Sequence, residues 1–232
     1  GAGRSAEQWV ARELRAVAGD LAPGEQAELD ARTSSLGYAE GLSSASLRKA
    51  VMPNGLGRHP FWDVASICST LAGKLAKVGL HEQGSSTRER VKPRATHPMR
   101  PLFDRMLRAF EIQQEVELAV SDHLMVPAIA CEDVPWLIVP SSLANASDAY
   151  AVAALAGPMT RIALGVPWLG ALAPHEVIAI VVGFARQVAP SFTATPRERI
   201  EPLIEEMEQK ARRAIDRKRR RMLEEIEPMI ER

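Results

Sequence analysis

Cysteine, aromatic residues and net charge are all scarce in this chain, and each shortage excludes a class of protein. The 232 residues include two cysteines, Cys68 and Cys131, which lack CxxC spacing. Two cysteines are too few for a disulfide framework and predict buried thiols in a reducing compartment, the cytoplasm, although one bridge between them stays open. Lys plus Arg and Asp plus Glu number 29 each. This balance predicts no general attraction to nucleic acid or to a membrane surface.

Long apolar runs are also missing. No run of about 18 uninterrupted apolar residues occurs, so we expect no membrane-spanning helix. The first residues lack the basic-then-apolar pattern of a secretion signal. The sequence does contain 46% hydrophobic residues, which is ample for a buried core. Because only 5% of the residues are aromatic and Ala and Leu are abundant, the composition favours helices over a β-sandwich.

Apolar spacing divides the chain into three regions. Residues 1–90 form an N-terminal helical region, whose best buried helix is expected over residues 61–78. The polar stretch 82–97 contains Gly, Ser and several basic residues without periodicity, and it predicts a flexible linker with a boundary near residue 90. Residues 91–194 form the second region, and residues 195–232 form a charged amphipathic C-terminal helix.

The second region combines both kinds of secondary structure. Helical spacing over 99–110 is followed by short apolar runs at 116–120, 125–129 and 136–139, which predict a small antiparallel strand meander. Residues 174–188 have almost no polar face and predict a buried helix, against which we expect the meander to pack. The predicted fold is therefore α+β and predominantly helical.

The C-terminal region carries an apolar stripe at spacings of three and four. A capping box at Thr195 opens it, and Pro202 and Pro228 are expected to kink or interrupt it. Such a stripe must bury against the domain or against a partner. The stripe is thus a candidate interaction surface, for self-association or for a protein partner, through Met207, Ala211, Ile215, Met222 and Ile226.

His175 and Glu176 begin a zinc-peptidase signature that is not completed. The signature needs a second histidine four residues on, so that both imidazoles leave one helix face, but that position is Ala179. Proline before the first turn and a carboxylate near the positive end of the helix dipole favour a capping role for this pair. A zinc-dependent peptidase or other hydrolase using His175 and Glu176 stays an alternative.

The segment 116–187 resembles the gluzincin metallopeptidases. Residues 136–139 are similar to their edge strand, residues 169–174 to the following turn, and Glu176 to the acidic start of the active-site helix. In this register Gly183 stands in place of the first histidine, Phe184 in place of the general base and Gln187 in place of the second histidine. Because glycine and phenylalanine cannot bind zinc or accept a proton from water, the resemblance implies an inactive pseudo-metallopeptidase scaffold without a metal or other cofactor.

The same segment, together with residues 216–225, also resembles a degenerate domain of long tetratricopeptide-containing proteins from myxobacteria. This resemblance implies a non-catalytic interaction or scaffolding domain from a larger protein. It agrees with the interpretation of the apolar stripe, and we take such a domain as the leading functional hypothesis.

One basic cluster could bind a phosphate backbone; it comprises Arg217, Lys218, Arg219, Arg220 and Arg221. Glutamates flank the cluster, and two expected pairs, Glu208 with Arg212 and Arg220 with Glu224, are four residues apart on a helix. A solvated, salt-bridged helix face is therefore favoured over nucleic-acid binding, since no aromatic residues suited to base stacking lie nearby.

Overall fold

The structure is a computed structural model that describes residues 12, 15, 22, 24–28, 31, 47, 59–192 and 200–230. The chain divides into two compact units, residues 1–40 and residues 41–232. In the first unit, residues 24–28 are helical, and Arg12 pairs with Glu28 at 2.9 Å. Most of the predicted N-terminal helical region before residue 59, and the capping box at Thr195, lie outside the described residues.

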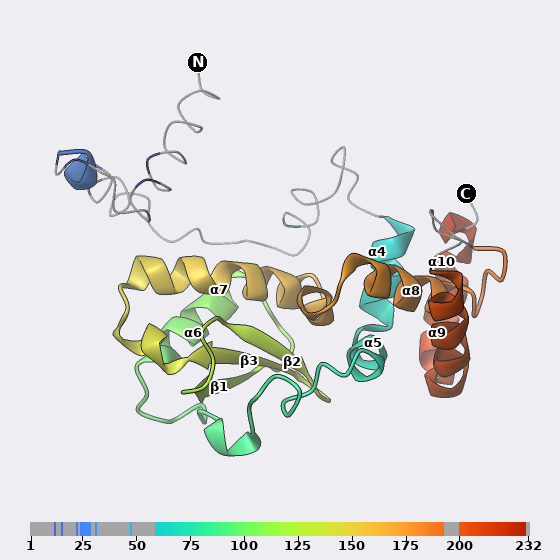
Figure 1. The fold of residues 1–232 in the computed structure, drawn as a ribbon, viewed down its shortest axis with the longest axis horizontal. Coiled ribbons are helices and arrows are strands. Elements are labelled where there is room, and N and C mark those ends of the chain that lie inside the picture. Colours follow the sequence, from blue (N-terminus) through green and yellow to red (C-terminus); the bar gives the residue numbers. More distant parts are fainter. Residues whose placement is uncertain are drawn as a thin grey trace. The chain divides into compact units, whose positions relative to one another are not determined.

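The second unit is mainly helical and contains one small sheet (Figure 1). This confirms the predicted α+β, predominantly helical class. In chain order its elements are α4 (Pro60–Ile67), α5 (Ser69–Leu75), η2 (Thr87–Glu89), α6 (Met99–Ala109), β1 (Glu117–Ser121), β2 (Ala128–Cys131), β3 (Pro135–Pro140), η3 (Ser141–Asn145), α7 (Asp148–Ala163), η4 (Pro167–Ala171), α8 (Pro174–Ala185), α9 (Glu201–Ala214) and α10 (Arg217–Ile230).

The sheet is mixed, with the order β1-β3-β2. β2 and β3 form an antiparallel hairpin, as predicted, but β1 pairs with β3 in parallel, so the expected all-antiparallel meander is wrong at this pairing. The connection over residues 122–127 carries the chain past the position of β3 before β2 begins. Consecutive strands β1 and β2 are therefore not neighbours in the sheet.

Alternate residues of the sheet contribute to two apolar clusters, as the strand period of two requires. Leu137 and Val139 of β3 join the main core, which includes Leu155 and Met159 of α7, whereas Ile138 belongs to a smaller cluster on the other face. In Figure 1, α7 and α6 lie beside the sheet, while α8 lies among α4, α5 and α9.

The predicted buried helix exists as α8, and every residue from Ala179 to Ala185 is buried. Its principal packing partners are α9 and α4, so the expected packing of the sheet against this helix is corrected. The physical reason is that α8 is apolar nearly all round. Helices on several sides cover it, and α7 takes the place beside the sheet.

Residues 82–97 are tied to the sheet and do not form the predicted linker. The N–H of Val91 donates to the carbonyl oxygen of Leu118 at 2.8 Å, and Arg90 forms a bridge with Ala119. The carboxylate of Glu89 accepts hydrogen bonds from the hydroxyls of Ser85 (2.7 Å) and Ser121 (3.0 Å). The polar composition of this segment thus reflects hydrogen bonding within the chain.

We expect Glu89→Gln to reduce the sensitivity of the fold to acid. The hydroxyl of Ser85, then the N–H of Ser86 and the hydroxyl of Ser121, hold the pKa of Glu89 below its ordinary value. Such a carboxyl stabilises the fold above its unfolded-state pKa of about 4.3, and this contribution is lost as pH falls through the lower folded-state pKa. Urea unfolding at neutral pH and at about pH 3 should show a smaller loss of stability in the variant than in the wild type.

The exposed Glu115 provides the matched control for this measurement. Glu115→Gln should keep the acid sensitivity of the wild type. Equal acid sensitivity in Glu89→Gln and the wild type would contradict the role given to the serine hydrogen bonds.

The C-terminal segment forms two helices, not the single long helix predicted. The break falls at Ile215 and Asp216, where Ile215 is extended and the carboxylate of Asp216 accepts from the N–H of Arg219 at 2.8 Å. Asp216 thereby acts as the N-cap of α10. Pro202 lies in the first turn of α9, where proline is tolerated, and Pro228 lies within α10.

Both cysteines are buried and free, in agreement with the buried thiols that the sequence predicts, and they form no disulfide with each other. Burial raises the pKa of the Cys68 thiol and of the Cys131 thiol to about 12. Both thiols are therefore neutral at physiological pH and poor nucleophiles.

Within the described ranges, no helix has both the length and the apolar character needed to cross a membrane.

Candidate functional site

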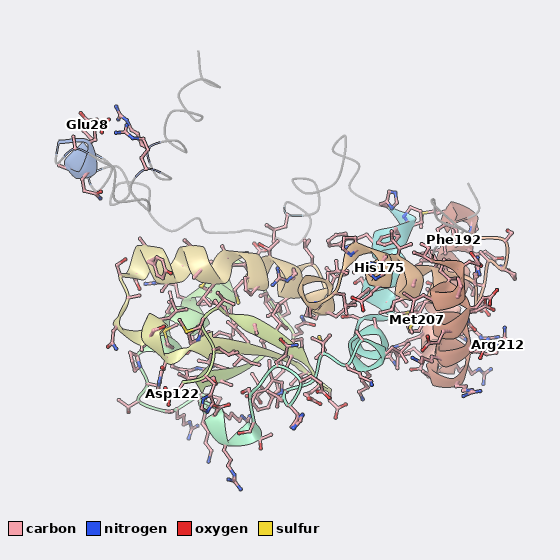
Figure 2. The ribbon with its side chains drawn as sticks, viewed as in Figure 1. Glu28, Asp122, His175, Phe192, Met207 and Arg212 are labelled. Atoms are coloured by element: carbon pink, nitrogen blue, oxygen red, sulfur yellow. The ribbon has the colours of Figure 1, made fainter. Side chains whose placement is uncertain are left out.

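His175 and Glu176 lie in the first turn of α8, and their surroundings support the capping role (Figure 2). The Glu176 carboxylate accepts a hydrogen bond from the N–H of Ala173 at 2.8 Å, while the imidazole of His175 is exposed. In the part of the chain that the structure describes, no group of three or more His, Cys, Asp or Glu side chains could hold a metal ion. The structure thus gives Glu176 a structural partner and brings no further ligand to His175.

Two of the three positions at which the gluzincin resemblance expects catalytic groups, Gly183 and Gln187, lie at the contact between α8 and α9. A Cβ on Gly183 would come within 2.8 Å of the Glu208 backbone nitrogen, so only glycine permits this approach of the two helices. Phe184 is buried, and the amide of Gln187 donates to the carbonyl oxygens of Gly183 (2.9 Å) and Glu208 (3.2 Å). Helix packing therefore accounts for each of these residue types.

The predicted interaction stripe is largely covered by the chain itself. Met207, Ala211 and Ile226 are buried in the main core, Ile215 is half-buried, and Met222 is exposed. Figure 2 shows Met207 on the side of α9 toward α5 and α8, and Arg212 on the opposite side. In this conformation the stripe stabilises the fold and leaves only Met222 as a large apolar surface residue of the set.

The basic cluster forms an exposed face of α10. Arg217, Lys218, Arg220 and Arg221 are exposed, whereas Arg219 is half-buried and pairs with Asp216. The predicted pair Glu208–Arg212 is present at 2.9 Å. The ion pairs between described residues do not include Arg220–Glu224, although both side chains are exposed. One side of this cluster borders a hollow of about 450 Å³ that also contacts Met222 and Glu225.

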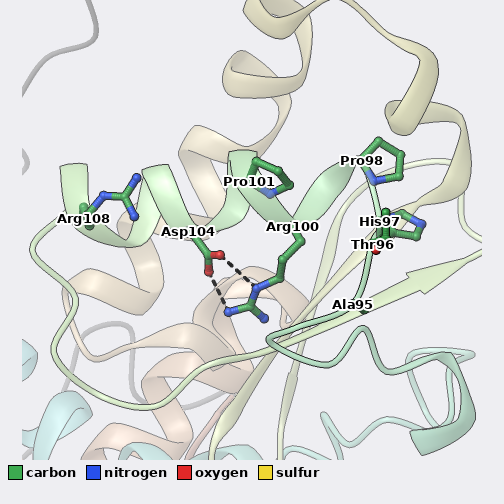
Figure 3. Close-up of a pocket in the computed structure, with 8 residues that line it drawn as sticks. All are labelled: Ala95, Thr96, His97, Pro98, Arg100, Pro101, Asp104 and Arg108. Atoms are coloured by element: carbon green, nitrogen blue, oxygen red, sulfur yellow. Dashed lines mark hydrogen bonds and ion pairs between the residues drawn. The ribbon is translucent and has the colours of Figure 1, made fainter.

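A second hollow, of about 650 Å³, lies at the start of α6 (Figure 3). Its central cation is Arg100, whose guanidinium binds both carboxylate oxygens of Asp104, at 3.1 and 2.6 Å. The same guanidinium lies over the ring of Phe103, with 5.1 Å to the ring centroid. His97 accepts from the N–H of Met99 at 3.2 Å. The charge of Arg100 is thus already neutralised within the chain.

A third hollow, of about 520 Å³, is mainly apolar, and we call it the apolar groove. The exposed large hydrophobic side chains of the described residues are Met125 (90% exposed), Val126 (69%), Tyr150 (59%) and Met222 (39%). The first three all line this groove. Its lining is completed by Pro127, Ser142, Leu143, Ala154, Pro158 and Arg161.

The fold brings the walls of the apolar groove together from segments that are distant in sequence. One wall is the connection between β1 and β2, which carries Met125 and Val126. The other is a face of α7 on which Tyr150, Ala154, Pro158 and Arg161 recur at helical spacing. The sequence does not reveal this site, because the apolar run at 125–129 predicts a strand that includes Met125 and Val126, whereas β2 begins only at Ala128.

Among the described residues that line the apolar groove, Arg161 is the charged one, and its guanidinium lies close to Gly170. A Cβ on Gly170 would come within 2.6 Å of its Cζ and within 2.7 Å of its Nε, so the guanidinium lies directly over this glycine. Its Nε is buried without a hydrogen-bond partner among the described residues. Burial lowers the pKa of Arg161.

Comparisons of the chain with models of protein families, with curated proteins and with solved structures find no match. We therefore infer function from the arrangement of the residues. Of the three hollows described above, the apolar groove combines the most exposed apolar side chains with a cation that lacks an ion-pair partner among the described residues. It is the candidate functional site.

Proposed function

We propose that this chain is a non-catalytic protein-interaction domain of the scaffolding type, which binds a segment of a partner protein in the apolar groove. The observation that carries the proposal is the gathering of Met125, Val126 and Tyr150 around one hollow. Exposed apolar side chains are ordinary when scattered, but a contiguous patch of them marks an interaction site.

The chemistry of the groove supports binding over catalysis. The described residues that line it include no imidazole, carboxylate or thiol, which are the usual groups for acid–base and nucleophilic steps. Methionine and tyrosine are instead common at protein interfaces, because methionine adapts its shape and tyrosine combines apolar area with a hydroxyl. Burying Met125 and Val126 against a partner would stabilise a complex by about 1.5 to 3 kcal/mol for each fully covered side chain.

A selection from displayed random peptides of about twelve residues tests this proposal. The wild-type chain serves as the target, and the variant Met125→Ser/Val126→Ser serves for counter-selection. We expect enriched peptides to bind the wild type at least about tenfold more tightly than the double variant, because the variant loses the apolar area. Isothermal titration with synthetic peptides measures both affinities.

Met222→Ser is the matched control, since Met222 is an exposed methionine outside the groove. This variant should bind the selected peptides as the wild type does. The double variant should unfold within about 0.5 kcal/mol of the wild type, because both replaced side chains are exposed. If no enriched peptide distinguished the wild type from the double variant, the proposal would be wrong.

A further inference from the structure

Arg161 is a half-buried cation without an ion-pair partner among the described residues. Burial is the cause of its lowered pKa. Its Nε lacks a hydrogen-bond partner in the described part of the chain. Removing a charge from water without pairing it costs free energy, and a ligand that pairs with it recovers part of that cost.

The guanidinium also lies close to the backbone of η4. A Cβ on Gly170 would overlap it, at 2.6 Å from its Cζ. Arginine offers a planar fork that matches both oxygens of a carboxylate. The position of Arg161 therefore suits recognition of one planar anion.

The apolar surroundings indicate which kind of molecule carries that anion. Tyr150, Ala154 and Pro158 precede Arg161 along one face of α7, and Met125 and Val126 lie on the opposite wall. A polyanion such as nucleic acid requires several cations that track its backbone, whereas the described residues that line the groove include one. A mainly apolar peptide with one acidic side chain fits both the apolar walls and the single charge.

The helix also sets a spacing for such a peptide. From Tyr150 to Arg161 the axis of α7 rises about 16 Å, at 1.5 Å per residue. An extended peptide advances about 3.3 Å per residue, so the same distance corresponds to about five peptide residues. The acidic residue of the peptide should therefore lie about five positions from the apolar or aromatic residue that contacts Tyr150.

Resting on the proposed function, we propose that Arg161 makes the apolar groove selective for a partner segment in which an Asp or Glu side chain accompanies apolar residues. The carboxylate binds the Arg161 fork, and the apolar side chains cover Met125, Val126 and Tyr150. The half-buried guanidinium, its place among apolar lining residues and the lack of an ion-pair partner among the described residues together support this selectivity.

A double-mutant cycle with the peptides selected on the wild type tests the inference. The protein variants are Arg161→Gln and Arg161→Lys, and each peptide is made with its acidic residue intact or changed to the amide. We expect Arg161→Gln to lower the affinity for the acidic peptide at least about tenfold and to leave the affinity for the amide peptide unchanged. Arg161→Lys should recover only part of the affinity, because lysine keeps the charge and loses the fork.

Two controls separate this effect from general causes. Arg108→Gln removes one exposed charge outside the groove and should leave binding unchanged. Thermal unfolding of Arg161→Gln shows that the variant is folded, and its binding of the amide peptide at wild-type affinity shows that the groove is intact.

The remaining outcomes contradict the inference in distinguishable ways. Enriched peptides without an acidic preference, bound equally by wild type and Arg161→Gln, would overturn the role of Arg161 and leave the proposed function standing. Binding abolished by amidation of the peptide C-terminus, but not by changing the acidic side chain, would overturn the side-chain assignment. Failure to enrich any groove-dependent peptide would overturn both proposals.

Discussion

Replacing Phe184 with alanine should lower the free energy of unfolding by about 3 to 5 kcal/mol. The Phe184 side chain is only 1% exposed and lies in the part of α8 where every neighbour from Ala179 to Ala185 is buried. Truncation removes the apolar area of the ring and leaves a cavity that the surrounding helices cannot fully close. Urea unfolding followed by circular dichroism measures the change.

Tyr150→Ala is the control for Phe184→Ala, because Tyr150 is an aromatic residue of a helix with 59% exposure. The free energy of unfolding of Tyr150→Ala should differ from that of the wild type by no more than about 0.5 kcal/mol. An unfolding midpoint of Phe184→Ala within error of the wild type would show that this face of α8 is not core, and the burial described for α8 would be wrong.

The second large effect is expected at Gly183, where the backbone of α9 lies against α8. An alanine Cβ would lie 2.8 Å from the Glu208 backbone nitrogen and 2.9 Å from the Met207 carbonyl carbon, and backbone atoms cannot move aside as a side-chain end can. We expect Gly183→Ala to lower the free energy of unfolding by about 1 to 3 kcal/mol through overpacking. This loss should appear although alanine favours helix over glycine by about 1 kcal/mol.

Gly157→Ala is the matched substitution, since Gly157 lies in α7 and its added Cβ would meet only the end of Arg161 at 3.9 Å. Here the helix propensity should act alone and stabilise the chain by up to about 1 kcal/mol. The changes in the free energy of unfolding of the two variants should therefore have opposite signs in the same urea unfolding measurement. A stabilising Gly183→Ala would contradict the close helix contact and would show that the packing of α8 on α9 does not require glycine at position 183.

The spacing of apolar residues in the sequence predicts those helices whose burial is visible in a short stretch of chain. The helix α8 follows from an apolar run without a polar face, and the burial of Val181 and Phe184 follows with it. The expected single helix over residues 61–78 proved to be α4 and α5, which meet at Cys68. The break in the C-terminal segment at Asp216 rests on a side-chain cap that an apolar stripe does not reveal.

Features that depend on distant segments could not be predicted in this way. The parallel pairing of β1 with β3 is decided by the path of residues 122–127, and the attachment of Val91 to Leu118 uses the edge of β1 that β3 does not occupy. The apolar groove is of the same kind. Nothing near Arg161 in sequence indicates that Gly170 lies beneath its guanidinium, or that Met125 stays exposed.

The placement of the C-terminal stripe changes which surface carries the proposed function. Because Met207, Ala211 and Ile226 are buried by the chain itself, a partner would have to displace α9 and α10 to reach them. The apolar groove needs no such rearrangement, since Met125, Val126 and Tyr150 are exposed in the folded chain. This difference in cost is why we assign partner binding to the groove.

Methyl resonances of the methionines test this assignment most directly. The full chain, labelled at the methionine methyl groups, is titrated with a peptide selected on the wild type and observed by nuclear magnetic resonance. Partner binding in the apolar groove predicts that the Met125 methyl resonance shifts in a saturable manner while that of Met222, exposed on α10, stays in place. A saturable shift of Met222 with Met125 unchanged would contradict the account and would assign the interface to the C-terminal helices.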